Sequence, residues 1–143
     1  MRIHGSCHCG NLCFQLDWEP DPDRIPARAC GCTFCVKHGG VWTSHPSAAL
    51  VVTVREPALV SHYSFGTSTA VFHICARCGG VPVVTSEIDQ HQYAVVSVNA
   101  FDSVPQSMLQ RAAADFEGES IDSRLARRKR GWIANVRFIE GAA

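Results

Sequence analysis

The distribution of cysteine is the feature of this chain that most restricts its fold. The sequence holds eight cysteines, and seven of them fall into three clusters: C-x-C at 7–9, C-x-C-x2-C at 30–35 and C-x2-C at 75–78. Cysteines scattered along a short secreted chain are typical of a disulfide framework, whereas tight clusters in a reducing compartment are typical of metal sites. The pattern therefore predicts a fold organised around bound metal.

The first and third clusters suit one closed zinc site. Structural zinc is held tetrahedrally by four ligands, commonly cysteine thiolates. In both "CHCG" (7–10) and "CARCGG" (75–80) a glycine follows the second cysteine, where the chain must turn sharply. The two pairs together would supply a complete set of thiolates and join the N-terminal part of the chain to its middle.

The middle cluster, within "ARACGCTFCVKHGG" (27–40), has three cysteines, one fewer than a closed zinc site needs. Three protein ligands with an exchangeable fourth position are typical of catalytic zinc. The spacing leaves other partitions open: Cys13, His8 or His38 could close this site, and the 7–9 pair could join it. Without such a role, Cys13 is expected to be a free thiol packed under a loop.

Length and charge restrict the class of protein. With 143 residues the chain has the length of one domain, and we expect a single zinc-binding domain over residues 1–143. Lys plus Arg and Asp plus Glu number 13 each, so no net charge draws the chain to nucleic acid or to an anionic membrane. The apolar runs are far shorter than the roughly 18 residues of a transmembrane helix. The N-terminus has no apolar segment typical of a secretory signal, and we therefore expect a cytoplasmic protein.

Hydrophobic periodicity predicts a mainly β fold. Residues 11–18 alternate between apolar and polar side chains, which is the pattern of a half-buried strand, and "EPDPDRIP" (19–26) reads as a loop. Short strands at regular spacing favour a mainly antiparallel arrangement. The further predicted strands are Val41–Ser44, Leu50–Val54, Val60–Phe65, Ala70–Ile74, Val81–Thr85, Tyr93–Val98 and Trp132–Ile139.

One helix is predicted near the C-terminus, over residues 121–130. Ser120 is a suitable N-cap, Asp122 lies in the first turn, basic residues lie in the last turn, and Gly131 ends the run. The basic run "RRKR" (127–130) is interpreted as a solvated helix face and not as a nucleic-acid site. Residues 107–116 fit either another short helix or an irregular segment.

Three motifs together resemble a known family. "GSCHCGNLCFQL", "CGCTFCVKHGG" and "FHICARCGG" follow one another in an order similar to that of the glutathione-dependent formaldehyde-activating enzymes, a family that includes centromere protein V. The motifs span residues 5–80, and the tail "SRLARRKRGWIANVRF" also resembles members of the family. The resemblance implies an Mss4-like fold, in which antiparallel sheets form a tent-like β sandwich around zinc.

The same resemblance implies two zinc ions, one structural and one labile with an open position. It implies a carbon–sulfur lyase-type enzyme acting on a thiol/aldehyde adduct, as in the formation of S-(hydroxymethyl)glutathione from glutathione and formaldehyde. Gly31 stands where many members have histidine. The implied ligands are Cys7, Cys9, Cys75 and Cys78 for the structural ion, and Cys30, Cys32 and Cys35 for the second, catalytic ion.

Side chains near the clusters suggest further roles. We hypothesise that Lys37 or Arg77 pairs with a substrate carboxylate and that His38 moves a proton, because histidine titrates near neutral pH. Trp42 is expected to belong to the core and not to a substrate wall.

Two functions of other classes are compatible with the same cysteines. One is a non-catalytic binding module that zinc merely stabilises. The other is a thiol redox sensor, in which oxidation of the middle cluster expels zinc. Similarity of fold does not choose among these functions, because one fold can carry many of them.

Overall fold

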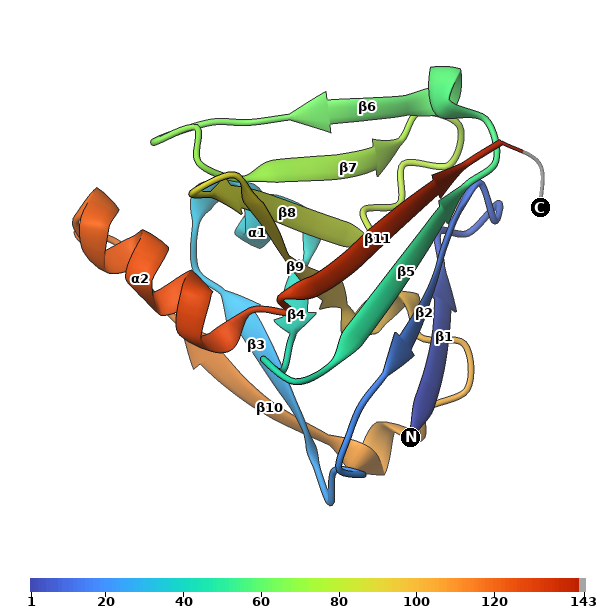
Figure 1. Cartoon of the computed structure of the whole chain (residues 1–143), viewed down its shortest axis with the longest axis horizontal. Coiled ribbons are helices and arrows are strands. Elements are labelled where there is room, and N and C mark those ends of the chain that lie inside the picture. The colour runs from blue at the N-terminus through green and yellow to red at the C-terminus, as the bar shows by residue number, and fades with distance from the viewer. Residues whose placement is uncertain (142–143) are drawn as a thin grey trace.

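The alternating apolar segments form strands that assemble into two sheets (Figure 1). The computed structural model describes residues 1–141. Its helices are α1 Thr33–His38 and α2 Ile121–Gly131, with short 3-10 turns η1 Pro57–Leu59, η2 Val98–Ala100 and η3 Gln106–Met108. Its strands are β1 Arg2–Ser6, β2 Leu12–Asp17, β3 Ile25–Cys30, β4 Val41–Thr43, β5 Ala49–Val54, β6 Val60–Tyr63, β7 Val71–Cys75, β8 Val83–Ile88, β9 His91–Ser97, β10 Leu109–Ala114 and β11 Asn135–Glu140.

The two sheets differ in size and share one core. The smaller has the strand order β1–β2–β5–β11, and the larger has the order β10–β3–β4–β9–β8–β7–β6. In the smaller sheet Phe14 pairs with Val52 and Leu16 with Leu50, and these buried side chains meet Ile25 and others from the larger sheet. Burying each such side chain stabilises the fold by about 1.5–3 kcal/mol. The predicted mainly β fold with a C-terminal helix is confirmed.

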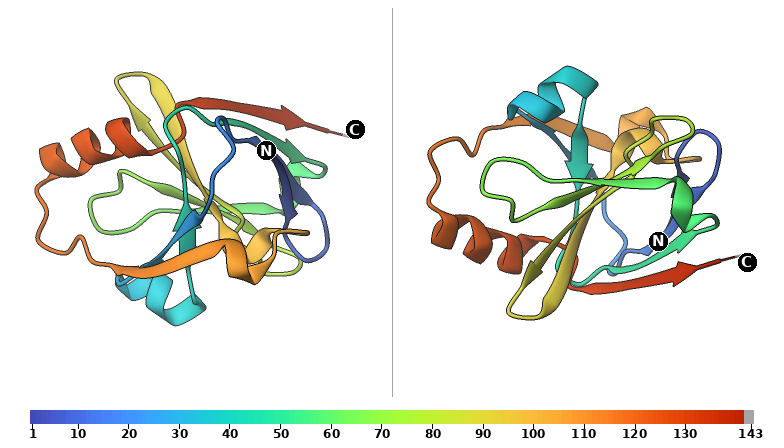
Figure 2. Two further views of the ribbon diagram at one scale, coloured as in Figure 1. Left: turned by 90° about the horizontal axis from the view of Figure 1, so that it is seen from below. Right: turned by 90° about the horizontal axis from the view of Figure 1, so that it is seen from above.

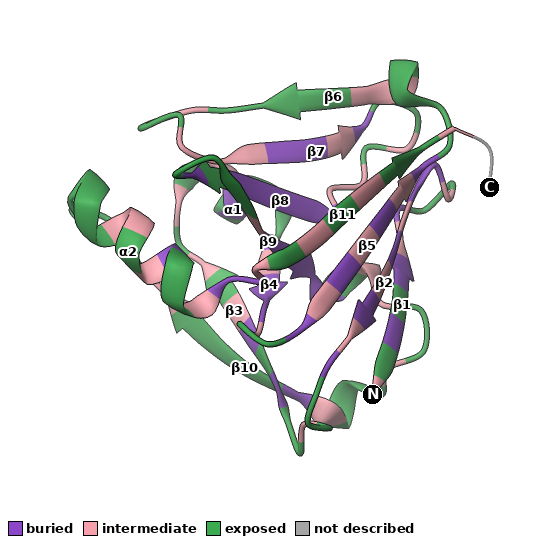
Figure 3. Ribbon diagram, viewed as in Figure 1, coloured by how far each residue is buried: buried purple, intermediate pink, exposed green. Residues whose placement is uncertain are grey.

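The central strands of the larger sheet are buried on both faces, as their colour in Figure 3 shows for β8. Val83 and Val96 point into the shared core, whereas their neighbours Val84 and Val95 belong to a second cluster on the opposite face. Successive side chains of a strand point to opposite faces, so a continuous apolar run serves both clusters. The second cluster also contains Cys35, so the middle cysteine motif lies on the face turned away from the shared core.

Helix α2 forms as predicted. The Ser120 hydroxyl accepts a hydrogen bond from the Ser123 backbone N–H at 3.1 Å, which caps the N-terminus. The helix ends at Gly131 and leads into β11, and it lies at the opposite end of the molecule from the C-terminus (Figure 2). Among the described residues, none of the helices has the length and apolar character needed to cross a membrane.

Three expectations about local structure were wrong or incomplete. Residues 107–116 are mainly a strand, β10, because they pair with β3 along the whole strand although most of their side chains are exposed. The arrangement is mainly antiparallel, as expected, but β10 pairs with β3 and β11 with β5 in parallel, which was not predicted. Parallel pairs need long crossovers, which no local pattern reveals. The elements β1, β3 and α1 had no prediction.

Gly5 should be among the most sensitive positions of the core. A Cβ atom there would lie 2.8 Å from the carbonyl oxygen of Ala100 and would overlap the ring of Phe14. We therefore expect Gly5→Ala to destabilise the protein by about 1–3 kcal/mol, because overpacking forces neighbours apart. Gly131→Ala is the control, since its Cβ would meet nothing within 4 Å. Thermal unfolding of the two variants gives the comparison, and equal midpoints would contradict the packing described.

Candidate metal centres and substrate cavity

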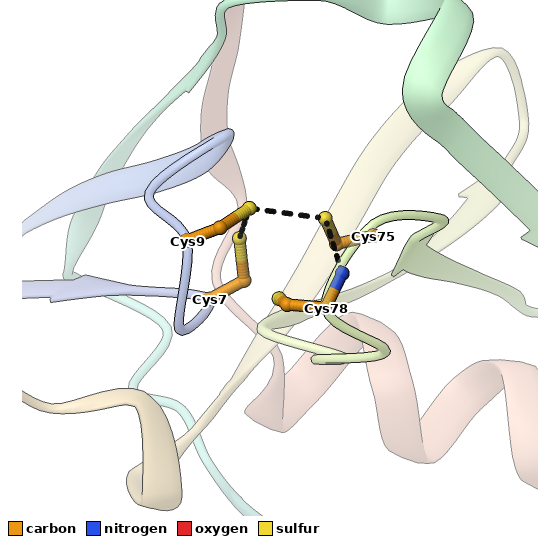
Figure 4. Close-up of side chains that lie close together, drawn as sticks. All are labelled: Cys7, Cys9, Cys75 and Cys78. Carbon is orange, nitrogen blue, oxygen red and sulfur yellow. Dashed lines mark hydrogen bonds between the residues drawn. The ribbon is translucent and has the colours of Figure 1, made fainter.

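Four cysteines from two distant turns meet at one point (Figure 4). Cys7 and Cys9 follow β1, while Cys75 ends β7 and Cys78 lies in the turn after it. Their Sγ atoms all lie within 4.8 Å of one another, with Cys9 and Cys75 at 3.5 Å and Cys7 and Cys9 at 3.9 Å. Four thiolates at about 2.3 Å from a tetrahedral zinc would stand about 3.8 Å apart. The cluster therefore has the size of a zinc site.

Backbone groups surround these sulfurs. The Leu12 N–H donates to Cys7 Sγ at 3.3 Å, and the Cys78 N–H donates to Cys75 Sγ at 3.5 Å. A Cβ atom on Gly80 would stand 2.9 Å from the Cys7 Cβ, so a glycine is needed there for the two turns to approach. Burial raises the pKa of Cys7 to about 12. Burial also raises the pKa of Cys78, but backbone hydrogen bonds from Cys9 and Gly80 outweigh it and lower that pKa to about 6. A divalent ion would displace the remaining protons.

The middle cluster joins the end of β3 to helix α1. Cys30 is the last residue of β3, Cys32 is the N-cap of α1, and Cys35 lies buried within the helix. Their Sγ atoms lie within 4.8 Å of one another. The Cys35 N–H donates to Cys32 Sγ at 3.4 Å, and the Gly31 N–H donates to the Ala114 carbonyl at 2.8 Å, which ties this turn to β10. We call Cys30, Cys32 and Cys35 the cysteine trio.

The Trp42 side chain contacts the cysteine trio. The Trp42 indole N–H donates to Cys35 Sγ at 3.3 Å, and both side chains are buried. A Cβ on Gly40 would lie 3.1 Å from the same sulfur, so the turn after α1 packs closely against it. The hydrogen bond from Cys35 lowers the pKa of Cys30 to about 5, while the same bond and burial raise the pKa of Cys35. These contacts thus favour a thiolate at Cys30 over one at Cys35.

The trio lacks a fourth side-chain ligand. Within residues 1–141, no further Cys, His, Asp or Glu ligand atom joins the trio inside the 4.8 Å limit that defines it. Neither Cys13 nor His8 completes it: the Cys13 thiol donates to the Gly10 carbonyl at 3.0 Å, and His8 is exposed. An ion held by three thiolates would keep one coordination position for another molecule.

The trio opens into a cavity of about 430 Å³. Binding sites for small molecules commonly have volumes of about 300–1,000 Å³. One wall is aromatic and apolar, and comes from Trp42, Phe65, Phe72, Val84, Val95 and Trp132. Trp42, expected in the core, is therefore both a core residue and a wall of the cavity. Residues 114–118 and three arginines of helix α2 complete the lining.

The face of α2 toward the cavity carries arginines instead of apolar residues. Arg124, Arg127 and Arg128 line the cavity, and their i, i+3, i+4 spacing places them on one side of the helix. The interpretation of the 127–130 run as a solvated face was therefore wrong for its first two residues, although Lys129 and Arg130 are exposed. The R-x2-R-R spacing indicates that these arginines share one side of the helix. It does not show whether that side faces solvent or the rest of the fold.

Glu119 holds two of these arginines in place. Its carboxylate accepts two hydrogen bonds from Arg127, at 3.0 and 3.1 Å, and one from Arg124 at 3.4 Å. The Arg127 guanidinium also lies 3.5 Å above the centre of the Phe116 ring. The hydrogen bonds from Arg127, and then those from Arg124, lower the pKa of Glu119. This network fixes the segment that closes one side of the cavity.

The structure does not bring every candidate residue to the cavity. Lys37 and His38 belong to α1 but are exposed and do not line the cavity; the His38 ring stands 4.4 Å from that of Phe34. Burial lowers the pKa of His38. Arg77 lies in the turn of the four-cysteine cluster, where its side chain pairs with Glu56 at 3.5 Å. The catalytic and substrate-binding roles suggested for these residues stay predictions.

Comparison with known proteins identifies a family and a solved structure of similar fold. The model of the family described as glutathione-dependent formaldehyde-activating enzyme matches residues 2–118. A crystal structure of a Rhodobacter sphaeroides protein, a structural-genomics target, is similar with a TM-score of 0.52 and 25% sequence identity, over 73% of this chain and 92% of the other. No protein in the search of curated sequences matches this chain.

The Glu119 network should make stability depend on pH. Because the pKa of Glu119 is lowered in the folded chain, its contribution is present above the carboxyl's ordinary pKa of 4.5 and is lost as the pH falls through the lowered value. We expect Glu119→Gln to cost about 1 kcal/mol at pH 7, typical of a small charge network. This difference should shrink at acidic pH in urea unfolding series.

Glu87→Gln is the matched control, because Glu87 is exposed on β8 and forms no ion pair within the described chain. A Glu119→Gln deficit that stays constant from pH 7 down to pH values where the carboxyl is protonated would show that the network is not electrostatic.

Proposed function

Because the chain belongs to the glutathione-dependent formaldehyde-activating enzyme family, we propose that it is a zinc-dependent carbon–sulfur lyase-type enzyme that joins a small-molecule thiol to an aldehyde. The founding pair of substrates, glutathione and formaldehyde, is the first choice. The main support for this proposal is the cysteine trio. It offers three candidate metal ligands, with no fourth within residues 1–141, and it lines a cavity large enough for a small molecule.

Each cysteine group has a separate task in this proposal. The Cys7, Cys9, Cys75 and Cys78 group holds a structural zinc, since its sulfurs have the spacing of a closed tetrahedral site. The trio holds a second, labile zinc. A thiol bound at the open position of that ion would have a lowered pKa, and would be a thiolate at neutral pH. The charge of three cysteinates favours this activation of a thiol over polarisation of an aldehyde oxygen.

The surrounding residues prepare the trio for such a thiol. The Trp42 indole N–H withdraws charge from the Cys35 sulfur and fixes its position, as an outer hydrogen bond does for many metal ligands. The apolar wall restricts water near the reacting atoms. The reaction itself involves no redox change: the thiol sulfur forms a bond to the aldehyde carbon, and the thiol proton ends on the aldehyde oxygen.

The proton requires a carrier, for which His38 is the candidate. Partial desolvation lowers its pKa, which favours the neutral imidazole that can accept a proton. It stands on the same short helix as Cys35. Because its ring does not line the cavity, the transfer would have to pass through water.

Metal content distinguishes the enzyme from a merely zinc-stabilised module. We expect two zinc ions per chain, of which a mild chelator removes one without unfolding the protein, because the trio's ion is the one with an exchangeable position. Cys30→Ser should retain one ion and the fold. Cys9→Ser should lose much of its thermal stability. Elemental analysis with thermal unfolding checks this, and two ions that both resist the chelator would contradict an open site.

Activity is tested by following adduct formation from glutathione and formaldehyde by NMR exchange. We expect the protein to accelerate the reaction above background and Trp42→Phe to lower kcat by roughly 10- to 100-fold, because the Cys35 sulfur loses its hydrogen bond. Cys13→Ser is the matched control, since Cys13 lies outside both groups and a serine hydroxyl can also donate to the Gly10 carbonyl. If the protein holding both ions gives no acceleration, the proposed reaction is excluded.

A further inference from the structure

Two arginines that line the cavity pair with no carboxylate in the described chain. Of the four arginines that line it, Arg124 and Arg127 pair with Glu119. Arg28 and Arg128 form no ion pair within residues 1–141. A half-buried or buried guanidinium without a carboxylate is costly, so this pair needs an explanation.

Arg28 stands beside the trio. It lies two residues before Cys30 on β3, so the two side chains leave the same face of the strand at about 6.6 Å, and both line the cavity. Its Nη2 donates to Ser44 Oγ at 2.8 Å, and Ser44 Oγ in turn donates to the Gly131 carbonyl at 2.8 Å. This contact fixes the guanidinium at the end of α2, and its other N–H groups form no hydrogen bond within the described residues.

Arg128 is held by neutral groups, and its guanidinium lies 4.9 Å from the centre of the Trp132 ring. Its side chain is buried, with 7% of the residue exposed. Its Nη1 donates to Thr69 O at 3.2 Å, to Thr69 Oγ1 at 2.8 Å and to Ser86 Oγ at 3.1 Å. All these acceptors are neutral, and the buried Nε–H has no partner within the described chain. Burial, and then the neighbouring Arg127, lower the pKa of Arg128 to about 10, as expected for an uncompensated cation.

The nearby carboxylates do not compensate these two arginines. Asp115 and Glu117 also line the cavity, but the Asp115 carboxylate accepts a hydrogen bond from the Glu117 backbone N–H at 2.9 Å, and neither residue forms an ion pair within the described residues. The cavity is therefore lined both by the trio and by two arginines without a carboxylate partner in the described chain.

We propose that Arg28 and Arg128 form a carboxylate-binding subsite that selects an anionic thiol and directs its sulfur to the trio. Arginine suits this task because its planar fork binds a carboxylate through parallel charged hydrogen bonds. The selection rests on the proposed function, because it presumes that the trio binds the thiol. Thiols with a carboxylate, glutathione among them, are then preferred, and neutral thiols of similar size are poor substrates.

Binding is measured without chemistry, using S-methylglutathione and its dimethyl ester as probes in calorimetry with the zinc-loaded protein. The wild-type protein should bind the acid at least 10-fold more tightly than the ester, because hydrogen bonds from arginine to a carboxylate are about twice as strong as those between neutral groups. Arg28→Gln should lose most of this preference. Arg130 is an exposed arginine of helix α2 that does not line the cavity, so Arg130→Gln should keep the preference for the acid.

Arg128→Lys is a second variant, which retains the positive charge but lacks the planar guanidinium. It should weaken binding of the acid by less than Arg28→Gln does. If it fails to fold, as thermal unfolding would show, Arg28→Gln still decides. Equal binding of acid and ester by the wild type, or an unchanged preference in Arg28→Gln, would overturn the subsite.

The outcomes also separate this subsite from the proposed reaction. Acid preference without any acceleration of thiol–formaldehyde condensation would refute the reaction and retain the subsite. Acceleration that is equal for 3-mercaptopropionate and 2-mercaptoethanol, without acid preference, would retain the reaction and refute the subsite.

Discussion

The pleat of the larger sheet is the constraint on which the rest of the structure depends. Ile25 and Ala27 of β3 point into the core between the sheets, so Arg28 and Cys30 must point to the opposite face. The same alternation separates Val83 from Val84 and Val95 from Val96. One face of the sheet therefore stabilises the fold, while the other is available for the trio, the aromatic wall and the cavity. The site is supported by the core without being part of it.

The arginines of helix α2 supply the charged part of the cavity lining. The cavity is closed on one side by a helix that presents arginines, and a surface helix would normally place apolar residues on its covered face. Glu119 and Phe116 hold Arg127, while Thr69 and Ser86 hold Arg128 from the neighbouring loop and from β8. These contacts keep like charges close together, a costly arrangement that makes sense for a site that receives an anion. The chain has no net charge, yet four arginines line its cavity, and only two of them pair with a carboxylate in the described chain.

Much of the fold could be predicted from local patterns. The alternation of residues 11–18, the turns at double glycines and the caps of α2 depend on neighbours in sequence, and the elements they predict are found with shifted ends. The strand β10 could not be predicted, because its small and exposed side chains show no period and its partner β3 lies about 80 residues away, further than any local signal reaches. For the same reason, the two parallel pairs followed only from the assembled sheets.

The sequence alone determined which cysteines are candidate metal ligands. In a C-x-C or C-x2-C motif a single short turn holds the sulfurs close together, whatever the rest of the chain does. Only the tertiary structure decided which groups combine: Cys7 meets Cys78 across the sheets, and within residues 1–141 no fourth candidate ligand joins the trio. It also brings Arg28 and Arg128, which are remote in sequence, to the same cavity, while Arg77 and Lys37 do not line it. The sequence states the charge of each side chain. Whether that side chain is buried or exposed depends on which face of its helix or strand packs against the rest of the folded chain.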